Sequence, residues 1–155
     1  MAGWLARWFS KKRKAQGAAA STGVVWQLRV ERERGAVGKL NDRLEVTLRP
    51  SVPEPVVRAL QVALDELLTN VIMHARQASG PIELRLARSA RSLDAEISYL
   101  ADEFDPTVLR DSARATSFAD SKIGGLGVPL VRALMDEFRH EYVDGRNVVH
   151  LRKKC

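Results

Sequence analysis

The sequence is poor in the features that mark secreted and membrane-spanning proteins. Its one cysteine, Cys155, is the last of 155 residues, so no disulfide can form within the chain and the composition fits a reducing compartment. No stretch approaches the roughly 20 apolar residues that a transmembrane helix needs. We therefore expect a cytoplasmic protein.

An excess of basic residues is also missing from most of the chain, although its net charge is +6. Residues 1–20 carry five bases and no acids, so residues 21–155 carry a net charge of only one. In that region acids and bases are interspersed, which argues against a basic nucleic-acid-binding face. The bases of the first segment are Arg7, Lys11, Lys12, Arg13 and Lys14.

Residues 1–14 are expected to form a basic amphipathic tail. A helix would gather Trp4, Leu5, Trp8 and Phe9 on one side, and the basic cluster follows them directly. A secretory signal has the opposite order, with charge before a longer apolar core. Two interpretations remain: peripheral contact with the inner face of an anionic membrane, or a disordered or partner-docking tail. Residues 15–23 are small and polar, and indicate a flexible linker.

Residues 24–155 are expected to form one domain, because a hydrophobic content of 45% can build one core. The patterns predict an α+β fold, a two-layer sandwich with helices on one face of a mixed, mostly antiparallel sheet of about five strands. Asp144-Gly145 predicts a tight turn between the last two strands. The expected strands cover residues 24–30, 82–87, 93–99, 139–143 and 147–152. The expected helices cover residues 34–48, 54–77 and 127–138. A short helix followed by a mobile loop is expected in residues 105–123.

Two motifs in this domain point to chemistry. Glu66 and Asn70 are four residues apart and share one face of the long helix, where an amide oxygen suits a metal and a carboxylate suits a base. The run Gly124-Gly125-Leu126-Gly127 opens a later helix, whose free N–H groups suit phosphate. Each has a plainer alternative: the pair can be solvent-facing residues of an amphipathic helix, and the glycines a helix-start turn.

The order of these motifs resembles the GHKL (Bergerat-type) ATP-binding fold. Within it, Ala63–Ala75 (ALDELLTNVIMHA) and Gly124–Phe138 (GGLGVPLVRALMDEF) are similar to the partner-switching serine kinases that act as anti-sigma factors. The resemblance covers residues 24–154, and it implies ATP and Mg²⁺ as cofactors. It implies Glu66 as general base, Asn70 as the metal ligand, the four residues 124–127 as the phosphate site, and residues 107–123 as a lid, with Ser121 and Lys122 as phosphate contacts.

The resemblance also implies partners. These are a small antagonist protein, phosphorylated on serine, and a sigma factor or another output protein. Whether the chain is a monomer or a homodimer stays open.

One family motif is missing. The aspartate and glycine of an Asp-x-Gly motif that binds adenine are replaced by Tyr99 and Ala101, and the strand alternation turns Tyr99 inward. Either the site still binds ATP, with Asp102 or a water in place of the carboxylate, or Tyr99 fills the base subsite and the domain is a binding module without catalysis. The lost hydrogen bond costs about 1–3 kcal/mol. His150 stands where these kinases often carry threonine.

Overall fold

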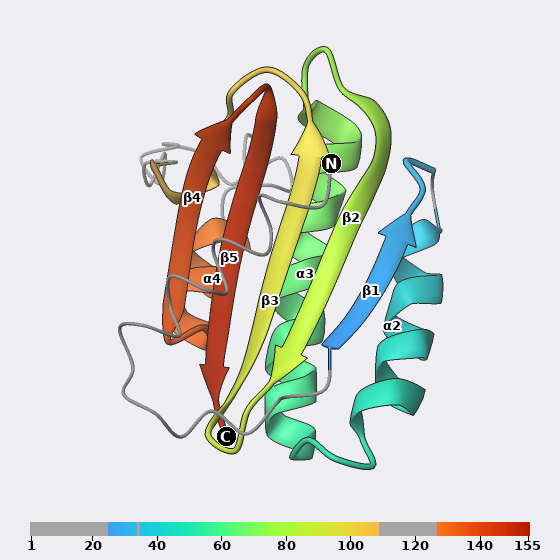
Figure 1. Cartoon of the computed structure of the whole chain (residues 1–155), viewed down its shortest axis with the longest axis vertical. Helices are drawn as coiled ribbons and strands as arrows, with labels where there is room; N and C mark the ends of the chain where they lie inside the picture. Colours follow the sequence, from blue (N-terminus) through green and yellow to red (C-terminus); the bar gives the residue numbers. More distant parts are fainter. Residues whose placement is uncertain (1–24, 34, 109–126) are drawn as a thin grey trace, which may run out of the picture.

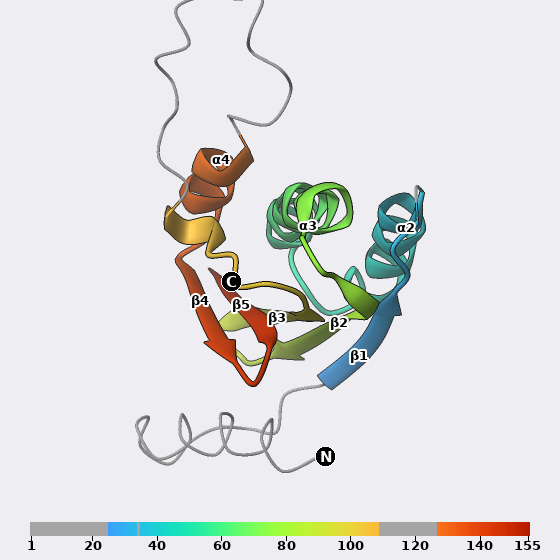
Figure 2. The same ribbon diagram turned by 90° about the horizontal axis from the view of Figure 1, so that it is seen from above.

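The computed structural model describes residues 25–33, 35–108 and 127–155. One antiparallel sheet forms the first layer and three helices form the second, all on the same face of the sheet (Figures 1 and 2). The elements are β1 (Val25–Val30), α2 (Ala36–Leu48), α3 (Glu54–His74), β2 (Ser79–Arg88), β3 (Ser92–Leu100), η1 (Pro106–Val108), α4 (Gly127–Leu134), β4 (Glu137–Val143) and β5 (Arg146–Lys154). This confirms the expected α+β sandwich.

The strand order is β1-β2-β3-β5-β4, which places β3 at the centre of the sheet. All four pairings are antiparallel, where the sequence had suggested a partly mixed sheet. Asp144 and Gly145 both have positive φ, at 51° and 75°, as a two-residue turn between antiparallel strands requires. The predicted turn between β4 and β5 is therefore confirmed.

Helix α4 is shorter than the sequence indicates, and this is a correction. It ends at Leu134, and β4 already begins at Glu137, because the Asp136 N–H donates to the carbonyl of Arg152 and Glu137 pairs with Arg152 on β5. Residues 136–138 therefore pair with β5, although the spacing of their apolar residues also suited a helix. On this short helix Leu130 is 44% exposed, whereas Val131 is fully buried.

Helix α3 lies over the centre of the sheet and supplies most of the core. Pro55 stands in its first turn, where a missing N–H costs nothing, and the helix ends at His74 because Ala75 turns to an extended conformation. The expected end at residue 77 is thus three residues late. The buried residues of α3 recur with helical spacing: Val56, Val57, Ala59, Leu60, Ala63, Leu64, Leu67, Leu68 and Val71.

The core lies between this helix layer and the facing side chains of the sheet. Ile82, Leu84 and Leu86 of β2 alternate inward, as do Leu93, Ala95, Ile97 and Tyr99 of β3. Within the described part of the chain, no helix is both long and apolar enough to span a bilayer.

Candidate nucleotide site

The site is built around Glu66 and Asn70, which lie one turn apart near the end of α3. Both side chains are half-buried, on the edge of the helix between its core face and solvent. The Asn70 Nδ2 donates to Glu66 Oε1 at 3.0 Å. The two side chains therefore act as one preorganised unit, with the carboxylate held in place by the amide.

The structure brings Gly127, the first residue of α4, directly against this pair. A Cβ built at Gly127 would lie 1.6 Å from the Cδ of Glu66 and 1.7 Å from its Oε1, so any side chain here would displace the Glu66 carboxylate. Glycine is therefore needed here to keep the Glu66 carboxylate in its present position. The carboxylate lies at the amino end of α4, and α3 packs against α4 more than against any other helix. The two motifs that the sequence separates meet at one place.

Several predicted residues lie outside the described residues. These are the tail 1–14, the linker 15–23, Gly124, Gly125 and Leu126 of the glycine run, Ser121 and Lys122, and the lid beyond residue 108. Of the predicted phosphate site, only Gly127 is described. Their roles stay predictions.

Tyr99 lies on the helix side of β3, 1% exposed, as its strand phase predicts. The Arg32 guanidinium lies 5.8 Å from the ring centroid and donates to the carbonyls of Gly80 and Leu100, so these hydrogen bonds to β2 and β3 hold Arg32 over the Tyr99 ring. Burial raises the pKa of Tyr99 to about 12, which Arg32 partly opposes, so the hydroxyl stays neutral at physiological pH. A neutral phenol oxygen can accept a hydrogen bond from the adenine amino group, but it is a weaker acceptor than a carboxylate.

Ala101 and Asp102 follow Tyr99 at the end of β3. Ala101 is buried, and the side chain of Asp102 is exposed. The Asp102 N–H donates to the carbonyl of Arg76 at 3.0 Å. This bond fixes the backbone of Asp102, and its role in nucleotide binding stays a prediction.

Sequence reasoning missed a buried polar network beside this segment. Asn147 of β5 is fully buried, accepts from the Phe104 N–H at 2.8 Å and donates to the Asp102 carbonyl at 2.8 Å. His140 Nε2 lies 2.9 Å from the same Asn147 Oδ1. A polar residue at an inward position of a strand, directly after the Asp-Gly turn, was the available signal.

The donor set near Glu66 fits a magnesium ion held mainly by nucleotide. Among the described residues, no group of three or more His, Cys, Asp or Glu side chains could hold a metal alone. Mg²⁺ commonly takes one or two protein oxygens and completes its shell with phosphate and water. Asn70 commits its nitrogen to Glu66, and no described residue donates to its oxygen, so that oxygen suits the ion.

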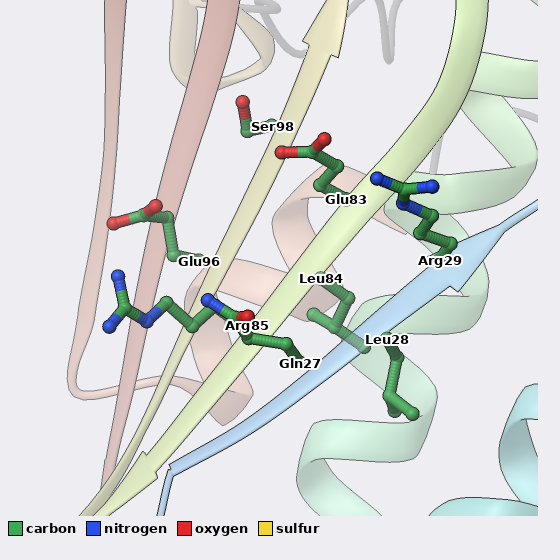
Figure 3. A pocket seen from close by; sticks show the side chains of 8 residues that line it. All are labelled: Gln27, Leu28, Arg29, Glu83, Leu84, Arg85, Glu96 and Ser98. Atoms are coloured by element: carbon green, nitrogen blue, oxygen red, sulfur yellow. The ribbon is translucent and has the colours of Figure 1, made fainter. Parts of the chain in front are cut away.

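The sheet also carries a polar cavity of about 330 Å³ on the face opposite the helices, away from Glu66 and Gly127 (Figure 3). Side chains from β1, β2 and β3 line it, with Glu83 and Arg29 together on one side and Arg85 beside Glu96 on the other. Burial raises the pKa of Glu96 to about 6, Arg85 opposes this, and Glu141 and Glu83 add to it. The cavity is not part of the candidate nucleotide site.

Comparison with known proteins assigns the chain to a family. The family described as histidine kinase-like ATPase domain matches residues 30–153, which is most of the chain. The chain belongs to this family. A serine/threonine-protein kinase, BtrW of Bordetella bronchiseptica, is 31% identical over 90 residues, which cover 57% of this chain and 63% of the kinase.

A solved structure of the RsbU and RsbW domains of a Mycobacterium tuberculosis protein has the same fold. The TM-score is 0.58 at 12% identity, and the match covers 83% of this chain and 32% of the other. The predicted membership of the histidine kinase-like (GHKL) ATPases is confirmed by the family match, and the expected resemblance to serine kinases agrees with the similarity to BtrW. The Glu66–Gly127 contact lies within the residues that this family matches.

Proposed function

We propose that the protein is a partner-switching regulator that phosphorylates a small antagonist protein on serine, using ATP. The observation that carries this is the contact of Glu66, itself held by Asn70, with Gly127 at the start of α4. The pairing places a base candidate and a cation ligand beside helix N–H groups and a positive dipole end, which favour phosphate. Similarity to BtrW, named a serine/threonine-protein kinase, favours serine as acceptor.

In the proposed reaction, the serine oxygen of the antagonist attacks the terminal phosphorus of ATP. The bond from that phosphorus to the ADP oxygen breaks, and the serine proton passes to the Glu66 carboxylate. Asn70 holds the carboxylate in position through its 3.0 Å hydrogen bond. Bound Mg²⁺ neutralises phosphate charge, and Asn70 Oδ1 is the side-chain oxygen that would hold it.

The test is phosphotransfer from Mg²⁺-ATP to a cognate antagonist, with phosphoserine measured by mass spectrometry. Glu66→Gln keeps an acceptor for Asn70 but cannot take a proton, so we expect loss of phosphoserine with ATP binding retained. Asp65→Asn is the matched control, because Asp65 is the neighbouring exposed acid on the same helix. Phosphorylation that persists in Glu66→Gln would refute the assigned base. In such a system, release or capture of a sigma factor or another output protein would follow the antagonist's phosphorylation state.

A second candidate is a binding module of the same fold without catalysis. Tyr99 favours it, because its ring is buried under Arg32 at the position where the family resemblance implies an adenine-binding aspartate. Titration calorimetry separates the two candidates. Micromolar binding of Mg²⁺-ATP would end the module proposal, and no binding at millimolar ATP would end the kinase proposal.

Peripheral membrane contact through residues 1–14 is a separate proposal supported by sequence alone. Trp4 and Trp8 beside four consecutive cations suit the headgroup region of an anionic bilayer. In flotation with liposomes of phosphatidylserine and phosphatidylcholine, we expect the full chain to float and a form lacking residues 1–16 to remain below. Equal behaviour of the two forms would rule out this role and leave partner docking.

A further inference from the structure

The segment that follows β3, residues 101–105, is held from several sides by backbone and side-chain hydrogen bonds. On one side, the Asp102 N–H donates to the carbonyl of Arg76, just beyond α3. On the other, the amide of Asn147 bonds the Asp102 carbonyl and the Phe104 N–H, both at 2.8 Å. Asn147 thus satisfies two backbone groups that no strand pairing serves.

The hydrogen-bond roles in this network are fixed by chemistry. Because Asn147 Oδ1 accepts the Phe104 N–H, it is an acceptor, and an amide oxygen cannot donate to His140. The proton on His140 must therefore lie on Nε2, which donates to Asn147 Oδ1 at 2.9 Å. The side chain of His140 is only 4% exposed, so this bond is shielded from water.

The network continues from the sheet to helix α4. The other ring nitrogen of His140, Nδ1, faces Asp105 Oδ1 at 3.7 Å. Asp105 Oδ1 accepts from the N–H and hydroxyl of Thr107 at 2.8 and 2.7 Å. The Thr107 carbonyl in turn accepts from Arg132 of α4 at 2.5 Å. Hydrogen bonds thus join β5 and β4 to one end of residues 102–107 and helix α4 to the other end, and the covalent chain between Phe104 and Thr107 links the two.

This chain connects the two halves of the candidate nucleotide site. Residues 101–105 follow the strand end where the family binds the base, and α4 begins beside Glu66, where phosphate is expected. We infer that Asn147 and His140 are positioning residues that hold the base-side segment in register with α4, and so set the affinity for nucleotide. Neither touches the pair Glu66 and Asn70, so they act through the segment and the helix. This inference rests on the proposed function.

The experiment combines two measurements on the full chain. Titration calorimetry gives the Kd of Mg²⁺-ATP, and hydrogen–deuterium exchange without nucleotide reports the order of residues 101–108 and of α4. In Asn147→Asp, both oxygens are acceptors, so the Asp102 carbonyl loses its donor and faces a like charge. We expect faster exchange in both segments and a Kd raised about tenfold or more, since lost buried hydrogen bonds typically cost one to two decades.

A pair of substitutions at His140 separates positioning from packing. Glutamine can place an amide N–H where Nε2 lies, whereas leucine fills space without a donor. We expect the Kd of His140→Gln to stay near the wild-type value and His140→Leu to bind nucleotide more weakly. If Asn147→Asp does not fold, this pair tests the inference in its place. Arg139→Gln is the control, because Arg139 is the exposed neighbour of His140 on β4 and its ion pair is with Glu137, outside this network. Its Kd should change less than twofold.

Each outcome decides something different. Unchanged exchange in Asn147→Asp would overturn the inference whatever the nucleotide data show. Faster exchange with an unchanged Kd would also overturn it, because the segment would then be irrelevant to binding. Equal Kd values for His140→Gln and His140→Leu would show that His140 contributes only packing and no hydrogen bond that matters for binding. Wild-type protein that binds no Mg²⁺-ATP, while exchange still responds to Asn147→Asp, would instead refute the proposed function and with it the nucleotide role of these residues.

Discussion

Replacing Glu96 by glutamine should stabilise the protein. Glu96 lies on the central strand β3, only 4% exposed, on the face of the sheet opposite the helices. Its Oε2 has no hydrogen-bond partner among the described residues, and His150 Nδ1 lies 3.7 Å away. Burial raises the pKa of Glu96 from 4.5 to about 6, although Arg85 favours the charged form. The folded protein therefore resists ionisation of this carboxyl.

The sign and size of the effect follow from proton linkage. Below pH 4.5 Glu96 is protonated in both the folded and the unfolded chain, so its contribution is neutral. Between pH 4.5 and 6 the unfolded chain loses the proton first, and the stability of the folded state falls as pH rises. Above pH 6 both states are ionised and the penalty is complete. A rise of this size corresponds to about 2 kcal/mol.

The assay is urea unfolding followed by circular dichroism at several pH values from 4 to 8.5. We expect Glu96→Gln to match the wild-type free energy of unfolding near pH 4 and to exceed it by about 2 kcal/mol above pH 7. Glu31→Gln is the control, since Glu31 is exposed just beyond β1, and its effect should stay within about 0.5 kcal/mol at every pH. A constant difference across the pH range, or a Glu96→Gln protein that is less stable at pH 8, would refute the reasoning.

Two further substitutions test the site and the sheet. Gly127→Ala should push the flexible Glu66 carboxylate out of place and lower phosphotransfer about 100-fold, while the protein still unfolds at a similar urea concentration. Gly38→Ala is the control, because the space around Gly38 is open and activity should not change. Full activity in Gly127→Ala would contradict the close contact. Arg152→Met should cost about 2 kcal/mol in urea unfolding, because the half-buried Asp94, 2.6 Å away, loses its charged partner. A loss below about 0.5 kcal/mol would show that this pair contributes little to stability.

The fold could be predicted largely because strand and helix patterns were consistent with each other. Alternation in β3 placed Tyr99 inward, and Asp144-Gly145 specified its turn. The errors came where two patterns competed. Residues 135–138 suit a helix by spacing, yet Glu137 and Phe138 pair with β5, and only tertiary hydrogen bonding decides between the two.

The motifs of the site could be predicted from the sequence, but the hydrogen bonds that hold the neighbouring segment could not. Spacing alone put Glu66 and Asn70 on one helical face, and resemblance linked them to the glycine run. Nothing in the sequence shows that Asn147 reaches the backbone of Phe104, because that contact depends on the path of the chain after β3. Hydrogen bonds between distant segments carry no local pattern, so they become visible only in three dimensions.

The contact between Glu66 and Gly127 has a consequence for how this chain can evolve. A side chain at position 127 would displace the Glu66 carboxylate, so it costs activity for as long as the protein depends on Glu66. Reversal is then blocked as well, because a restored glutamate would meet the new side chain. Two positions far apart in the gene must therefore change in a fixed order, and a lineage that has given up the glutamate can drift at the glycine without further loss. A residue other than glycine at position 127 would thus mark a chain in which the carboxylate of residue 66 no longer holds this position.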